Sequence, residues 1–103
     1  MAVDEAIAYI KGNYSGSLKL GELAAAANLS ERQFSRLFRQ QTGMSFIAYL
    51  HTIRMEAACR LLTGTRHSVA EVAAAVGYAD LKFFHQLFKR KIGAAPRQYR
   101  DKL

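Results

Sequence analysis

Apolar residues recur along most of the chain at spacings of three and four, which is the period of an amphipathic helix. No stretch alternates between apolar and polar residues over the length of a strand. The pattern predicts helices over residues 3–11, 20–27, 31–42, 45–62, 68–76, 80–92 and 96–100. The expected fold class is therefore all-α, with about seven helices.

Residues that favour helix starts stand where these segments begin. Ser30, Ser45 and Asp80 are placed to cap the helices that follow them. Ser68 and Glu71, three positions apart before an apolar run, form the pattern of a capping box. These signals support the predicted boundaries on the N-terminal side.

Glycines mark the other boundaries. Gly43 and Gly93 are predicted left-handed C-caps. The pair Gly12-Asn13 is expected to end the first helix, and Gly64 is expected to break the long helix after residue 62. Gly21 stands in the first turn of the helix over 20–27, where no packing reason for it is evident from the sequence.

The two halves of the chain repeat one another. Residues 22–26 (Glu-Leu-Ala-Ala-Ala) match residues 71–75 (Glu-Val-Ala-Ala-Ala) at an offset of 49. After the turn that follows, the offset becomes 50, so the second turn is one residue longer. The later matches are Ser30 with Asp80, Phe34 with Phe84, Gly43 with Gly93 and Tyr49 with Tyr99. The repeat indicates a duplicated structural unit.

Each copy has the form of a helix, a tight turn and a second helix. Asn28 and Gly77 stand in the turns, and both tolerate the positive φ that a sharp reversal needs. The repeat predicts a first helix-turn-helix subdomain at 1–44, a linker helix at 45–62 and a second subdomain at 63–103.

The second helix of each copy has one apolar and one polar stripe. The apolar stripes, which we expect in the core, hold Phe34, Leu37 and Phe38 in one copy and Phe84, Leu87 and Phe88 in the other. The polar stripes hold Arg32, Ser35, Arg36 and Arg39, and in the second copy Lys82, His85, Gln86 and Lys89. A merely solvated face usually mixes both signs of charge, so these stripes favour a DNA-contacting surface.

The charge balance supports this interpretation. Fifteen Lys and Arg against eight Asp and Glu give a formal net charge of +7, which favours polyanionic partners. No apolar run is long enough to cross a membrane, and the N-terminus lacks a signal-peptide pattern. With a single cysteine, Cys59, the chain cannot form an internal disulfide. We expect a cytoplasmic protein with no membrane partner.

An enzyme is not expected, because no catalytic constellation is present. His51, His67 and His85 have no metal-ligand spacing with Cys59 or with one another, and no glycine-rich phosphate loop occurs. We therefore expect no metal and no cofactor. The alternative to DNA binding is a helical protein-interaction module that acts on RNA polymerase or another acidic partner.

From about Ala6 to Arg100 the chain resembles the DNA-binding domain of the AraC/XylS family of bacterial transcription regulators. The most specific stretch is residues 77–100, GYADLKFFHQLFKRKIGAAPRQYR. In the first half and the linker, family-like residues stand at Ser30, Phe34, Arg36-Leu37-Phe38, Gly43, Tyr49-Leu50, Arg54-Met55, Ala58 and Leu61-Leu62. The chain departs from the family pattern at Lys19 and Ala95, where capping residues are usual, and at Leu81 and Phe83, which make the second helix more apolar than in many relatives.

The resemblance implies that each second helix enters a major groove, which gives a bipartite site in duplex DNA. Base contacts are then expected from Arg32, Ser35, Arg36, Lys82, His85 and Gln86, since these side chains bond to base edges. Phosphate contacts are expected from Lys19, Arg39, Lys89, Arg90 and Arg97. The resemblance also implies RNA polymerase as a further partner, and an effector, if any, that binds a domain outside this chain.

Overall fold

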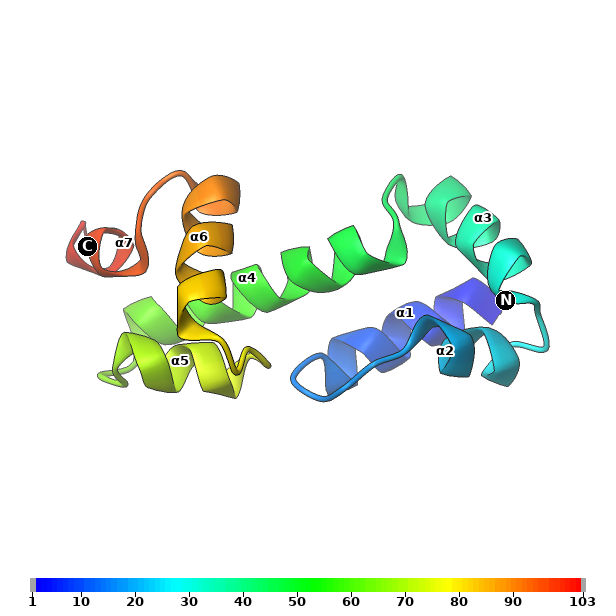
Figure 1. Ribbon diagram of the computed structural model, residues 1–103, viewed down its shortest axis with the longest axis horizontal. Coiled ribbons are helices and arrows are strands. Elements are labelled where there is room, and N and C mark those ends of the chain that lie inside the picture. The colour runs from blue at the N-terminus through cyan, green and yellow to red at the C-terminus, as the bar shows by residue number, and fades with distance from the viewer. Residues whose placement is uncertain (1, 103) are drawn as a thin grey trace. The chain divides into compact units, whose positions relative to one another are not determined.

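The computed structural model describes residues 2–102, which contain seven helices and no strand (Figure 1). The helices are α1 (Ala2–Asn13), α2 (Leu20–Ala26), α3 (Glu31–Thr42), α4 (Phe46–Gly64), α5 (Val69–Ala75), α6 (Leu81–Ile92) and α7 (Pro96–Asp101). The all-α prediction is confirmed. The chain divides into two compact units, Met1–His51 and Thr52–Leu103, and α4 continues from the first into the second.

The predicted caps form hydrogen bonds. The Ser30 hydroxyl accepts from the backbone N–H three residues later at 3.1 Å, and the Ser68 hydroxyl does the same at 3.0 Å. Ser45 caps α4 at 3.2 Å, and an Asp80 carboxylate oxygen caps α6 at 3.0 Å. The capping box at Ser68 is complete, since the side chain of Glu71 accepts from the Ser68 N–H at 2.7 Å.

Two helices continue beyond their predicted ends. α1 includes Gly12 and Asn13, and the Asn13 amide donates to a backbone carbonyl one turn earlier at 2.9 Å. α4 continues to Gly64, where the Thr63 and Thr65 hydroxyls donate to carbonyls one turn earlier at 3.0 and 2.6 Å. Both helices still end at the predicted breaks, Gly12-Asn13 and Gly64, two residues later than the predicted ranges, and these side chains satisfy carbonyls that the end of a helix leaves without partners.

The core of the first unit is formed by α1, α2, α3 and the first turns of α4. Phe38 lies within it: its ring centroid is 5.7 Å from that of Phe34, in a tilted pair, and 5.3 Å from that of Tyr49, in a perpendicular pair. The buried residues of this core are Val3, Ala6, Ile10, Leu23, Ala24, Phe34, Phe38, Phe46 and Leu50.

The core of the second unit repeats this aromatic geometry. The ring of Phe88 is 5.7 Å from that of Phe84, in a tilted pair, and 5.8 Å from that of Tyr99, in a perpendicular pair. Because Tyr49 lies in α4 and Tyr99 in α7, the first turns of α4 correspond to α7. The duplication therefore includes a third helix in each unit.

Two arginines of the second unit serve its fold. The Arg100 guanidinium donates from Nε to the Leu62 carbonyl at 2.8 Å and from Nη2 to the His67 carbonyl at 2.6 Å. These bonds connect α7 to the end of α4 and to the loop that follows it. Arg54 is nearly buried, and its guanidinium carbon lies 5.2 Å from the centroid of the Tyr78 ring.

Candidate nucleic-acid interface

In each unit, a tight turn joins the two helices of the helix-turn-helix, α2 to α3 or α5 to α6, and sets the direction of the second of them. Asn28 has a φ of 59° and Gly77 a φ of 107°, so the predicted positive φ is confirmed at both positions. The N–H that follows each of these residues donates to the carbonyl of the equivalent buried alanine, Ala24 or Ala73, at 2.9 Å. The two turns therefore close in the same way, and the extra residue of the second turn comes after this bond.

Gly21, unexplained in the sequence, is explained by the packing of α2 on α3. A Cβ atom at this position would lie 3.0 Å from a carboxylate oxygen of Glu31. The glycine lets this carboxylate approach the first turn of α2, where a negative charge is favourable. The Lys19 side chain makes no cap bond there, as the sequence predicted.

The predicted polar stripes of α3 and α6 lie on the surface of the units. The four residues Arg32, Ser35, Arg36 and Arg39, here called the α3 face, are all exposed. The four residues Lys82, His85, Gln86 and Lys89, called the α6 face, are exposed as well. Neither face includes a carboxylate. The other side of each helix is core, since Phe34, Phe38, Phe84 and Phe88 are completely buried.

The other predicted cationic residues are exposed and lie on different elements. Lys19 precedes α2, and Arg97 stands in the first turn of α7. Arg90 belongs to the last turn of α6 together with Lys89 and Lys91. Cations in this position also stabilise the helix, because they lie near the negative end of its dipole.

The net charge is distributed unequally between the units. Residues 1–51 contain five Lys or Arg and four acids, a formal charge of +1. Residues 52–103 contain ten Lys or Arg and four acids, a formal charge of +6. The second unit therefore carries most of the electrostatic attraction for a polyanion.

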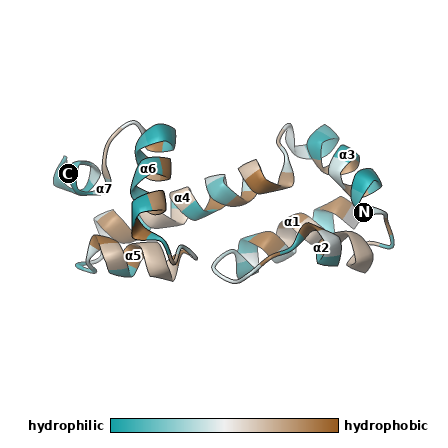
Figure 2. Ribbon diagram, viewed as in Figure 1, coloured by the Kyte–Doolittle hydropathy of each residue, from teal (hydrophilic) through white to brown (hydrophobic). Residues whose placement is uncertain are grey.

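In Figure 2, which is coloured by hydropathy, much of α3 and of α6 has the hydrophilic colour.

Sequence reasoning did not assign a role to two exposed apolar residues at the start of α6. Leu81 is 40% exposed and Phe83 is 43% exposed. Their counterparts in the first unit, at an offset of 50, are Glu31 and Gln33. The sequence identified Leu81 and Phe83 only as departures from the family pattern, and a comparison with the polar residues at the matched positions of the first repeat could have suggested a role for them.

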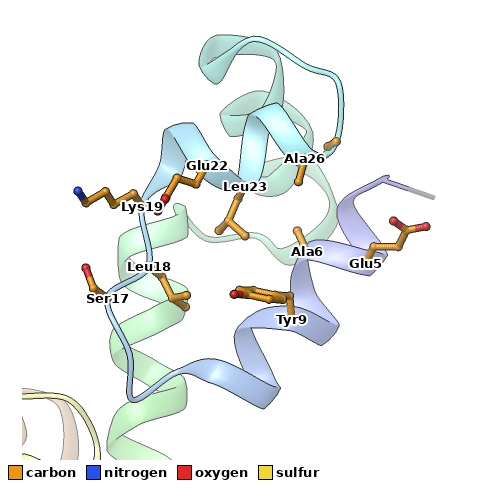
Figure 3. Close-up of a pocket in the computed structure, with 10 residues that line it drawn as sticks. Glu5, Ala6, Tyr9, Ser17, Leu18, Lys19, Glu22, Leu23 and Ala26 are labelled. Atoms are coloured by element: carbon orange, nitrogen blue, oxygen red, sulfur yellow. The ribbon is translucent and has the colours of Figure 1, made fainter.

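A pocket of about 470 Å³ lies in the first unit between α1, the following loop and α2 (Figure 3). Its polar lining includes Glu5, Tyr9 and Glu22, and apolar residues such as Leu18 and Leu23 complete the wall. Lys19 lines its edge, but no residue of the α3 face does. The pocket is thus a feature separate from that face.

Cys59 is a free cysteine on α4 with intermediate exposure. Burial raises the pKa of the Cys59 thiol, although a hydrogen bond with Tyr99 opposes this effect. A thiol that remains protonated at neutral pH lacks the thiolate form that a nucleophile needs. Within residues 2–102, no group of three or more His, Cys, Asp or Glu could hold a metal ion, and no helix has the length and apolar character to cross a membrane.

Comparison with known sequences identifies the family of the chain. A family model described as a helix-turn-helix domain matches residues 23–102. The transcriptional activator RhaR of Yersinia pseudotuberculosis is 45% identical over 74 residues, which are 72% of this chain and 26% of RhaR. The MmsAB operon regulatory protein of Pseudomonas aeruginosa is 36% identical over 96 residues, 93% of this chain and 31% of that protein. The chain thus spans between a quarter and a third of the length of these relatives.

Solved structures agree with this family. The C-terminal domain of AraT, a response regulator from Geobacillus stearothermophilus, has a TM-score of 0.94 and 38% identity, and the match covers 99% of this chain and 85% of that one. The DNA-binding domain of the global transcriptional factor AdpA, solved with a target DNA, has a TM-score of 0.93 and 33% identity, covering 98% of this chain and 91% of that one. The chain belongs to the AraC-type helix-turn-helix domains of transcription regulators.

Proposed function

We propose that this chain binds duplex DNA at specific sequences, with α3 in one major groove and α6 in the next, and that it regulates transcription as one domain of a larger regulator. The observation that carries the proposal is the duplication of a helix-turn-helix whose second helix is buried in the core on one side and presents, on the other, an exposed face of four cationic or neutral polar residues, the α3 face or the α6 face. Successive major grooves recur about every 34 Å along one side of the duplex, so two helices would contact two blocks about one turn apart.

Within this proposal the residues divide into two classes. Arg32 and Arg36 contact guanine, because a guanidinium bonds to O6 and N7 at once, and Gln86 contacts adenine. Ser35, Lys82 and His85 are the remaining base contacts. Lys19, Arg39, Lys89, Arg90 and Arg97 hold phosphates, which fixes the register of the protein without specifying sequence.

The experiment is selection of bound DNA from a random pool, followed by titration of the selected site. Two enriched blocks are expected, with centres about 10 base pairs apart. Insertion of about 5 base pairs between the blocks should abolish the affinity that the second block adds, because it moves that block to the opposite side of the DNA duplex. Enrichment of no sequence would overturn the proposal, and a single block would overturn its two-groove form.

The assignment of each residue to a base contact or a phosphate contact is tested by comparing the affinity of its alanine variant for the selected site and for random DNA. An alanine variant of a base-contacting residue should lose affinity for the selected site and keep its affinity for random DNA. A helical module specific for acidic protein partners would show no sequence preference in the same titration. That outcome would favour the alternative function.

We extend the proposal to activation, with RNA polymerase as a further partner in the bacterial cytoplasm, because the relative RhaR is a transcriptional activator. Transcription by purified polymerase from a template with the selected site tests this part. A rise in transcript that depends on the site supports activation. A fall supports repression at the same site, and would leave DNA binding intact.

A further inference from the structure

The first turn of α6 exposes a pair of large apolar side chains. In the described part of the chain, the exposed large hydrophobic residues are Tyr9, Ile47, Leu81 and Phe83. Two of these four, Leu81 and Phe83, stand on either side of Lys82, a residue of the α6 face. Apolar exposure is thus concentrated at the end of the helix that we propose to enter the groove.

The equivalent turn of α3 is built differently. There Gln33 completes a capping box, since its side-chain oxygen accepts from the Ser30 N–H at 3.0 Å. The Phe83 side chain has no hydrogen-bond acceptor and so cannot complete such a box; the Asp80 carboxylate caps α6 by accepting from the Phe83 N–H at 3.0 Å. A phenylalanine here gives up the second hydrogen bond of a capping box and leaves the residue 43% exposed.

The ring of Phe83 is nevertheless held in position. Its centroid lies 6.0 Å from that of Tyr78, which is 7% exposed. Tyr78 in turn packs against Phe84, at 5.6 Å, and against the guanidinium of Arg54, at 5.2 Å. The exposed edge of Phe83 therefore stands on a packed support, which reduces the entropy lost when a ligand contacts it.

We infer that Leu81 and Phe83 contact the C5-methyl groups of thymines in the block bound by α6. Thymine is the only base of unmodified DNA that presents a methyl group in the major groove, and apolar side chains are its partners. The N-terminal residues of a recognition helix are those that contact base edges. The inference rests on the proposed insertion of α6, and it gives the second block a preference for the thymine methyl group itself, which hydrogen bonds from Lys82 and Gln86 do not detect.

The test replaces each thymine of the selected second block, one at a time, with deoxyuridine. This change removes the methyl group and leaves every hydrogen-bonding group of the base in place. For the natural protein, each contacted methyl should account for about fourfold in affinity, the value of one buried methyl-sized group. The first block serves as the control: any change in affinity caused by deoxyuridine there should be the same for the natural protein and for variants of α6.

Two variants complete the experiment. Phe83→Gln introduces the residue of the matched position in α3, where it completes a cap, so folding should be retained; thermal unfolding followed by circular dichroism verifies this. Leu81→Ala removes the other apolar group. In each variant the penalty for uracil should disappear at the thymine that the missing side chain contacts.

The outcomes separate this inference from the proposed function. A protein that selects two blocks but tolerates uracil at every thymine of the second block overturns the inference alone. The same holds if the second block contains no thymine, or if the penalty persists unchanged in both variants. A protein that selects no sequence overturns the proposed function, and the inference with it.

Discussion

The two units of this chain share a buried framework and differ on their surfaces. The bond that closes the turn is 2.9 Å long in both, and the tilted aromatic pair has a centroid distance of 5.7 Å in both. The α3 face contains three arginines, whereas the α6 face contains none. Packing against many neighbours restricts the residues in a core, while an exposed position is restricted only by what it binds. The comparison therefore supports the proposal that the two units differ in what their outward faces, the α3 face and the α6 face, bind.

The charges of the units indicate how they would share the work of binding. A unit of formal charge +6 provides most of the attraction for phosphates, which depends on salt and not on sequence. A unit of charge +1 with three arginines on one helix face is better suited to discrimination between bases. We expect the first unit to dominate specificity and the second to dominate general affinity.

The largest effect should come from the matched core positions Phe34 and Phe84. Both rings are completely buried, so Phe34→Ala and Phe84→Ala should each lower the free energy of unfolding by about 3–5 kcal/mol. Chemical denaturation followed by circular dichroism measures the change. If the two substitutions differed by more than about half of this value, the frameworks would not be energetically equivalent.

The helices, turns and core positions of the two units could be predicted from the sequence, because the residue patterns that specify them are local or periodic. The repeat offset, the caps at Ser30 and Asp80 and the positive φ at Asn28 and Gly77 were predicted from residue type and spacing. The approach of Glu31 to Gly21 could not be predicted, because it depends on how two helices pack.

The roles of two arginines also depend on tertiary structure. Arg54 and Arg100 belong to the same basic composition as the residues of the outward faces, yet one packs on Tyr78 and the other donates to backbone carbonyls. Spacing along one helix distinguishes an outward side from an inward side. It does not show that a cation at the end of another helix has a partner 38 positions away in the chain.

The second prediction compares Arg36 with Gln86, which occupy equivalent positions on α3 and α6. Arg36→Ala should weaken binding to the selected site by about 1–3 kcal/mol and relax discrimination at one base pair. Gln86→Ala should have a smaller effect if the first unit dominates specificity. Fluorescence anisotropy on the selected site and on random DNA measures both. An equal loss on random DNA would reassign Arg36 to a phosphate.

The third prediction concerns the turns. Gly77→Ala should lower the free energy of unfolding by about 1–3 kcal/mol, because a φ of 107° is strained for any residue with a Cβ atom. Asn28→Ala should have a milder effect, about 1–2 kcal/mol, since 59° lies in the ordinary left-handed region. Asn28→Gly is the matched control and should retain stability in thermal unfolding. Loss of stability in that control would mean that the Asn28 side chain, and not its φ, is what the turn requires.

The fourth prediction tests the electrostatic role of the second unit. Lys89→Ala should weaken binding to all sequences alike and reduce the slope of log affinity against log salt by about 0.9, the value of one phosphate contact. Lys11→Ala removes an exposed cation of α1 that belongs to neither face, and serves as the control. Titrations at several salt concentrations give the slopes. A slope unchanged by Lys89→Ala would remove this residue from the phosphate contacts.

The smallest expected effect is on the pH dependence of stability. Of the capping boxes of α3 and α5, only the box of α5 contains a side chain that titrates, Glu71. Hydrogen bonds with Ser68 lower the pKa of Glu71, whereas the box of α3 uses the neutral Gln33. A carboxylate with a lowered pKa stabilises the fold at pH above its unfolded-state pKa, and this contribution is lost as the pH falls through the folded-state pKa. Glu71→Gln should therefore make thermal unfolding of the second unit less sensitive to acid, and Gln33→Glu should make the first unit more sensitive. Parallel curves of melting temperature against pH for Glu71→Gln and the natural chain would show that the Glu71 carboxylate does not close the box in solution.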